Sequence, residues 1–288
     1  MSRILSTALA FGLATAAFFS QAQTRSATNP IQNNGSRHLG FDRNLYPGDS
    51  ALPDLGKTFA FTGYWLNNPP GETTNTWQGK REILLRNHFG FLVLFNGRVD
   101  QEILRTKRHG TTPATLGKQD AAAAVAAAQR EHFPANTILF LDQEEGGRLL
   151  PEQAEYLLAW TEAVAASIYK PGAYLSAQPV SDSPGKTITT AEDLRQQIAT
   201  RHLHPVALFL YQDACPPSNG CIVTPPPISV TGVPEAAVWQ YAQSPRRPDI
   251  TRACAKTYAA DNNCYAPGVS GIPLDMNVAT SDDPSHGR

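Results

Sequence analysis

Residues 137–147, with the sequence TILFLDQEEGG, decide the fold that we expect for this chain. A short run of four apolar residues, 138–141, is typical of a strand that is buried on both faces in a parallel sheet. Three carboxylic acids follow: Asp142, Glu144 and Glu145. Because side chains alternate along a strand, Asp142 and Glu144 point to the same side. Two acids on one face beside a core suit a site that keeps one carboxyl group protonated and the other ionised, and the alternative is a solvated polar cap.

Other β-rich and helical segments surround this stretch. Eight segments have strand character, and residues 137–144 of the stretch above are one of them. The eight are 38–42, 59–65, 89–97, 137–144, 169–177, 204–212, 236–242 and 272–278. Helical patterns lie between them at 77–87, 118–132, 151–168 and 190–201. The links after the sixth and seventh strands are rich in proline and cysteine and have no clear helical pattern. This alternation predicts an α/β fold, a (β/α)8 TIM-like barrel with degenerate last units.

The first residues have the features of an export signal. Residues 1–22 combine Arg3, an apolar, alanine-rich stretch and a small-x-small cleavage site, and contain no twin arginine. An uncleaved membrane anchor is the alternative. The polar residues 23–37 are expected to form a flexible linker, and residues 38–288 the barrel domain. No later stretch is long and apolar enough to span a bilayer. We therefore expect a protein that is secreted or periplasmic and makes no stable membrane insertion after signal cleavage.

Charge and cysteine content narrow the function further. The formal net charge is −1 over 288 residues, so no basic excess indicates nucleic acid binding. Four cysteines behind an export signal predict disulfide bonds, and they are Cys215, Cys221, Cys254 and Cys264. Three pairings are possible, of which the local one, Cys215–Cys221 with Cys254–Cys264, would close two long loops. A zinc site is the alternative, but the spacing contains no C-x2-C pair.

The ends of the predicted strands carry many polar and aromatic residues. In a TIM-like barrel these ends converge on one rim, where hydroxyl groups of a sugar can be hydrogen-bonded and its apolar faces stacked. Trp239 is interpreted as barrel packing. The residues that we expect to bind a substrate at this rim are Tyr64, Trp65, Asn96, Gln178, Tyr211, Gln240, Tyr241 and Asn277.

Five short motifs resemble a known family in their order along the chain. They are GFD at 40–42, LDQE at 141–144, GAYLS at 172–176, VWQYA at 238–242 and LDMNV at 274–278. They resemble the secreted muramidases of glycoside hydrolase family 25, which cleave peptidoglycan. Residues 116–144 are more similar to a sister group, the secreted bacterial glycoside hydrolase-like barrel domain known as domain of unknown function 1906. The resemblance covers roughly residues 40–278.

The resemblance implies a set of site residues. The family's general acid falls on Glu144, its acidic partner on Asp142, and two further aspartates on Asp42 and Asp275. One departure is that Glu145 and two glycines follow the acid directly. The implied reaction needs no metal ion or other cofactor, because one carboxyl group protonates the leaving oxygen and a second group supports the positive charge. His202 and His204 are interpreted as structural residues.

The implied function is hydrolysis of a cell-envelope glycan, peptidoglycan or a related polysaccharide, by a monomeric exported protein. Two rivals are a catalytically silent glycan-binding barrel and a structural envelope protein. The enzyme hypothesis requires that Asp42, Asp142, Glu144 and Asp275 line one open cleft.

Overall fold

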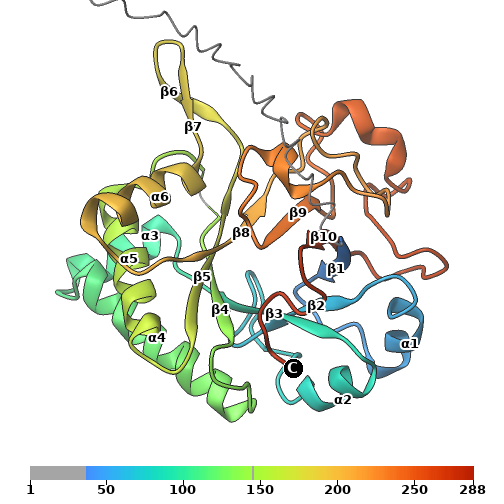
Figure 1. The fold of residues 1–288 in the computed structure, drawn as a ribbon, viewed down its shortest axis with the longest axis horizontal. Helices are drawn as coiled ribbons and strands as arrows, with labels where there is room; N and C mark the ends of the chain where they lie inside the picture. The colour runs from blue at the N-terminus through green and yellow to red at the C-terminus, as the bar shows by residue number, and fades with distance from the viewer. Residues whose placement is uncertain (1–36, 145) are drawn as a thin grey trace, which may run out of the picture. The chain divides into compact units, whose positions relative to one another are not determined.

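The computed structural model describes residues 37–144 and 146–288, so the predicted signal peptide and linker up to residue 36 lie outside them. Eight strands close into a barrel in the order β1-β10-β9-β8-β5-β4-β3-β2 (Figure 1). Each overlaps one predicted segment, which confirms the TIM-like barrel. The strands are β1 (His38–Asp42), β2 (Phe61–Trp65), β3 (Gly90–Asn96), β4 (Ile138–Asp142), β5 (Lys170–Ser176), β8 (Ala207–Tyr211), β9 (Val238–Ala242) and β10 (Asp275–Ala279).

The last strand departs from the (β/α)8 pattern. Every other pair of neighbours is parallel, but β10 is antiparallel to both β1 and β9. Asp275 therefore begins its strand opposite Asp42, at the rim where the parallel strands end, and Ala279 lies opposite His38 at the other end. Asn277 is paired with Gly40 and lies deeper in the barrel than the rim position expected for it.

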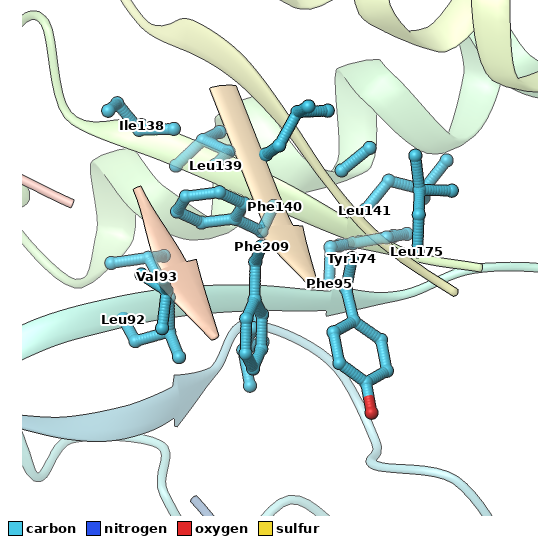
Figure 2. Close-up of a cluster of buried hydrophobic side chains, with 14 of the residues drawn as sticks. Leu92, Val93, Phe95, Ile138, Leu139, Phe140, Leu141, Tyr174, Leu175 and Phe209 are labelled. Carbon is cyan, nitrogen blue, oxygen red and sulfur yellow. The ribbon is translucent and has the colours of Figure 1, made fainter. Parts of the chain in front are cut away.

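The barrel interior alternates glycine with large aromatic side chains. A Cβ atom on Gly40 would lie 2.2 Å from the Phe61 ring, and one on Gly172 would lie 2.5 Å from the Phe140 ring. Glycine at these two positions makes room for the rings. The rings of Phe140 and Phe209 meet edge to face at 6.1 Å (Figure 2). These aromatic side chains form a packed floor beneath the rim.

The outer helices cover part of the barrel. The predicted helix at 118–132 begins earlier, as α4 (Pro113–Arg130), because the Thr112 side chain accepts a hydrogen bond from the Thr115 N–H and Pro113 fits the first helical position. It packs against α5 (Pro151–Ala165), where a Cβ atom on Gly117 would lie 2.3 Å from a backbone oxygen. The other helices are α1 (Leu52–Leu55), α2 (Arg81–Arg86), α3 (Asp100–Arg108) and α6 (Thr190–Arg201) (Figure 1).

No α-helix follows β8 or β9 within the described residues, as the sequence predicts. Short 3-10 turns, η2 (Ile228–Thr231) and η3 (Arg252–Thr257), lie there instead. Elsewhere the chain forms a further 3-10 turn, η1 (Asp49–Ala51), and an unpredicted hairpin of β6 (Val180–Ser183) and β7 (Lys186–Ile188).

Two disulfide bonds join the long loops. They are Cys215–Cys254 and Cys221–Cys264, so each connects the loop after β8 to the loop after β9. The local pairing within each loop does not occur. Disulfides of this kind suggest an extracytoplasmic location. None of the helices in the described part of the chain combines the length and the apolar character that crossing a bilayer requires.

Candidate active site

A cavity of about 280 Å³ opens at the carboxyl ends of the parallel strands. Its size is near the lower end of ordinary ligand pockets, which span about 300–1,000 Å³. All four predicted acids line it: Asp42, Asp142, Glu144 and Asp275. They come together because β1 and β4 end at this rim and the reversed β10 begins there. The other lining residues are Asn44, Trp65, Pro70, Leu94, Tyr174, Phe209, Gln240, Gln243, Ser244 and Pro245.

Asp42 is buried and held by two amide groups. Its Oδ2 accepts hydrogen bonds from Asn277 Nδ2 at 2.7 Å and from Gln240 Nε2 at 3.0 Å. Burial raises the pKa of Asp42 to about 6, the two amide donors oppose the rise, and the nearby charge of Glu144 adds to it. Asp42 therefore changes its charge close to neutral pH.

Asp275 lies opposite Asp42 on the neighbouring strand. Its Oδ1 accepts a hydrogen bond from the Ser244 N–H at 2.6 Å, and its Oδ2 lies 3.5 Å from Gln240 Nε2. Burial and then the charge of Asp42 raise the pKa of Asp275 well above its ordinary value. At neutral pH Asp42 is therefore largely ionised and accepts from its two amides, while Asp275 holds its proton to a higher pH than Asp42 does.

Gln240 is oriented by donors on its other side. Its Oε1 accepts from the Tyr174 hydroxyl at 2.6 Å and from Gln243 Nε2 at 2.8 Å. With the oxygen committed to these two donors, the Nε2 group must face Asp42 and Asp275. Gln240 thus bridges the two acids and stabilises whichever of them is ionised.

Hydrogen bonds to their carbonyl groups fix Asp142, which ends β4, and Glu144, which follows it. Gly97 N donates to the Asp142 carbonyl at 3.2 Å, and the Tyr211 hydroxyl donates to the Glu144 carbonyl. A Cβ atom on Gly97 would lie 2.4 Å from the same Asp142 oxygen, so only glycine permits this approach. Asp142 is buried, whereas Glu144 is exposed at the mouth of the cavity.

An arginine anchors the loop that departs from the muramidase motif. Arg148 binds both carboxylate oxygens of Asp182 on β6, with Nε–Oδ1 at 2.7 Å, and its Nη1 donates to Asp193 of α6 at 2.9 Å. The Leu149 N–H also donates to Asp193, at 3.1 Å. These contacts hold Arg148 and Leu149 against the β6–β7 hairpin and α6.

Two of the predicted substrate-binding residues line the cavity, Trp65 and Gln240. Trp65 Nε1 donates to the Arg43 carbonyl at 3.1 Å, which fixes the ring at the rim. Together with Leu94 of the adjacent β3 it gives the cavity an apolar wall, and Phe209 of β8 adds apolar surface elsewhere in the lining. A wall of this kind can stack against the apolar face of a sugar ring.

Tyr64 and Tyr241 are placed elsewhere, and the expectation that they reach the rim is wrong for both. They alternate with Trp65 and Gln240, which face inward, so they point out of the barrel. The Tyr64 hydroxyl donates to Glu131, and its ring packs against Phe133 at 5.2 Å. The Tyr241 hydroxyl donates to the Ile222 carbonyl at 3.3 Å.

The remaining four predicted residues contact other groups of the rim instead of lining the cavity. Asn277 supports Asp42 from below, and Tyr211 holds the Glu144 backbone. Asn96 Nδ2 donates to the Asn68 carbonyl at 2.9 Å, and Gln178 Nε2 lies 3.4 Å from Asp213 Oδ1.

Sequence reasoning missed several lining residues. Tyr174 could have been found, because it lies on a predicted strand and shares a face with Gly172. Gln243 and Ser244 follow β9 directly, but their approach to Gln240 and Asp275 depends on the path of the loop.

Removing the charge of Asp42 is expected to stabilise the protein at neutral pH. Its folded pKa, about 6, lies above its ordinary value of 3.8, so the folded state binds this proton more tightly. Stability from this group is therefore present below about pH 4 and is lost as the pH rises through 6, by about 3 kcal/mol. An Asp42→Asn variant keeps an oxygen for both amide donors and avoids that loss. Thermal unfolding should show its advantage over wild type growing between about pH 4 and 6.5 and levelling off above about pH 7, and a difference that stays constant across this range would contradict this account.

The described residues contain no group of three or more histidine, cysteine or acidic side chains arranged to hold a metal ion. His204 Nδ1 lies 2.8 Å from Glu162, and His202 ends α6 in a left-handed conformation.

This barrel is similar to one family model and to several solved structures. Residues 74–212 match the family model described as Rv2525c-like, glycoside hydrolase-like domain. Among curated protein sequences, none matches this chain. Among solved structures, the Tat-secreted protein Rv2525c of Mycobacterium tuberculosis, in complex with HEPES, is 11% identical, with 87% of this chain and 97% of that chain covered and a TM-score of 0.50.

Two further solved structures are similar. An uncharacterized protein of B. stearothermophilus is 19% identical, with 84% of this chain and 95% of that one covered and a TM-score of 0.49. The catalytic domain of the endolysin ply40, from bacteriophage P40 of Listeria monocytogenes, is 14% identical, with 88% and 98% covered and a TM-score of 0.44. At such identities a structural likeness concerns the fold alone. The residues matched by the family model contain β3, β4, β5 and β8 with Asp142 and Glu144, and the chain therefore carries an Rv2525c-like, glycoside hydrolase-like domain.

Proposed function

We propose that this protein is an exported glycoside hydrolase that acts on a cell-envelope glycan, peptidoglycan or a related polysaccharide. The observation that carries the proposal is the convergence of Asp42, Asp142, Glu144 and Asp275 on one open cavity. Glycosidic hydrolysis needs a carboxylic acid near the leaving oxygen and a second group that supports positive charge at the anomeric carbon. A cavity lined by Asp142 and Glu144 from one strand and by Asp42 and Asp275, both with raised pKa values, from two others could supply both.

Each acid has a role in this proposal. Glu144, exposed at the mouth of the cavity, donates the proton to the leaving oxygen. Asp142, buried beside it, orients an acetamido group of the substrate or stabilises the developing oxocarbenium ion. Asp42 and Asp275 hold a water molecule or the other two acids. The apolar wall around Trp65 provides a stacking surface for the sugar.

The proposal of export rests on residues 1–22 and on the two disulfide bonds. A positive start, an apolar stretch and a small-x-small site are the parts of a cleaved signal peptide. The protein is then secreted or periplasmic, acts as a monomer on a polysaccharide, and meets the cell envelope from outside the cytoplasm.

The test is the release of reducing ends by the purified wild-type protein from peptidoglycan and from a panel of other envelope glycans. We expect release from at least one of them. Retention of the folded protein on an insoluble glycan without any release would overturn hydrolysis and favour the silent binding barrel. Neither release nor retention would favour a structural role for the acids.

A further inference from the structure

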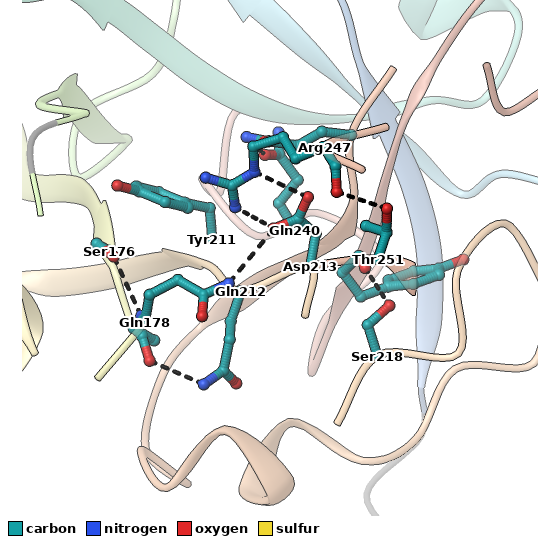
Figure 3. A network of polar contacts seen from close by, with 12 residues as sticks. Ser176, Gln178, Tyr211, Gln212, Asp213, Ser218, Gln240, Arg247 and Thr251 are labelled. Carbon is teal, nitrogen blue, oxygen red and sulfur yellow. Dashed lines mark hydrogen bonds and ion pairs between the residues drawn. The ribbon is translucent and has the colours of Figure 1, made fainter. Parts of the chain in front are cut away.

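Arg247 lies beside the proposed active site without being part of its wall. Its guanidinium carbon is 5.5 Å from the centroid of the Tyr211 ring (Figure 3). That ring packs against Tyr174, which lines the cavity, at 5.3 Å between ring centroids. The Tyr211 hydroxyl donates to the Glu144 carbonyl. Arg247 is therefore separated from the backbone of the proposed acid by one aromatic side chain.

A buried aspartate holds this arginine in one orientation. Arg247 Nε donates to Asp213 Oδ2 at 3.0 Å, and Arg247 Nη2 donates to Oδ1 of the same carboxylate. The Asp213 side chain is fully buried, whereas the side chain of Arg247 is 41% exposed. The Thr251 hydroxyl donates to the Arg247 carbonyl at 2.6 Å and fixes the backbone there. The guanidinium group is thus positioned before any ligand arrives.

The other end of the guanidinium group remains for a ligand. Asp213 occupies the edge formed by Nε and Nη2, and Nη1 makes no hydrogen bond within residues 37–144 and 146–288. The end formed by Nη1 and Nη2 matches the two oxygens of a carboxylate. Since Asp213 balances the charge of Arg247, recognition at this end depends on directed hydrogen bonds more than on general attraction of anions.

We propose that Arg247, seated on Tyr211, forms a subsite for a carboxylate carried by the glycan next to the sugar in the cavity. The acids that line the cavity repel any negatively charged group of the substrate. A carboxylate on the substrate is therefore favoured outside the cavity, where Arg247 lies. The substrate class is then an acidic glycan, in which a sugar carries a free carboxylate. This inference rests on the proposed function, because it names the glycan that the same site would take.

The experiment compares two forms of one ligand. Calorimetry measures binding of a hexasaccharide of alternating N-acetylglucosamine and N-acetylmuramic acid, and of the same hexasaccharide with its carboxyl groups reduced to alcohols. The protein is the full mature chain carrying Glu144→Gln, so that turnover cannot consume the ligand. We expect the carboxylate form to bind at least about tenfold more tightly, the gain typical of a well-placed charged hydrogen-bonded pair.

Two further variants assign the preference to Arg247. Arg247→Gln combined with Asp213→Asn removes the ion pair without leaving a buried charge unpaired, and it should bind both forms alike. Arg246→Gln is the matched control, because this neighbouring arginine donates to Asn262 at 2.7 Å and should leave the preference intact. Equal binding of both forms by the Glu144→Gln protein, or equal loss of the preference in both arginine variants, would overturn the subsite.

The outcomes separate this inference from the proposed function. If the protein prefers the carboxylate form through Arg247 but hydrolyses no glycan, the subsite is supported and the proposed hydrolase activity is contradicted. Hydrolysis of glycans with no preference for the carboxylate form would retain the enzyme and overturn the subsite. Binding of neither form would overturn the subsite whatever the activity.

Discussion

Glu144→Gln is expected to lower the rate of glycan hydrolysis by about 10²–10⁴-fold, the usual contribution of a general acid. Glutamine has nearly the shape of the acid and cannot donate a proton to the leaving oxygen. Because the Glu144 side chain is exposed at the cavity mouth, the substitution should cost little stability. Reducing-end release under saturating substrate measures the loss, and the midpoint of thermal unfolding checks the fold.

A matched substitution tests whether the loss is local. Glu235→Gln removes an exposed carboxylate that pairs with Arg195 at 2.8 Å and does not line the cavity. This variant should hydrolyse the glycan at the wild-type rate. Unchanged turnover in Glu144→Gln would move the proton donor to another of the four acids and refute the role given to this residue.

Replacing Cys221 and Cys264 together by serine is expected to lower the free energy of unfolding by about 4 kcal/mol. The bond joins residues 43 positions apart, so its loss frees a long loop in the unfolded chain. The effect should extend to the site. The Cys264 N–H donates to Ser244 Oγ at 2.8 Å, and the Ser244 N–H donates to Asp275.

Urea unfolding of wild type and of this double variant measures the difference. Wild type unfolded under reducing conditions should lose at least as much, since both disulfides then open. A change below about 1 kcal/mol in the double variant would show that the loops are held by their other contacts, and would contradict the expectation.

Short-range patterns account for the parts of the fold that were predictable. The apolar run before Asp142 and the proline at the start of α5 are local signals, and both elements form as expected. Each of the four acids could be singled out because it stands in a short motif that resembles the muramidase family, near a strand end. Their meeting in one cavity then follows from the closure of the barrel.

The remaining features depend on long-range contacts. Nothing near Asp275 in the sequence indicates that its strand runs in reverse, because alternation is the same in both directions. Tyr241 follows Gln240 directly and must face the opposite side of its strand, which contradicts its predicted position at the rim. The two disulfide bonds join the loop after β8 to the loop after β9, and these loops approach each other only because the barrel closes. The pairing therefore cannot be predicted from the spacing of Cys215 and Cys221.

The reversed direction of β10 determines which connection of the barrel can change in sequence and length next to the cavity. In an all-parallel barrel the segment between the last two strands must return to the opposite end of the barrel, and an outer helix forms most of that connection. Here β9 ends and β10 begins at the rim, so residues 243–274 both leave and re-enter on the cavity side. This segment contributes Gln243, Ser244 and Pro245 to the cavity and places Arg247 beside it. Changes in the length or composition of residues 243–274 can therefore alter which ligand binds, while the barrel strands and the packing of α4 against α5 stay as they are.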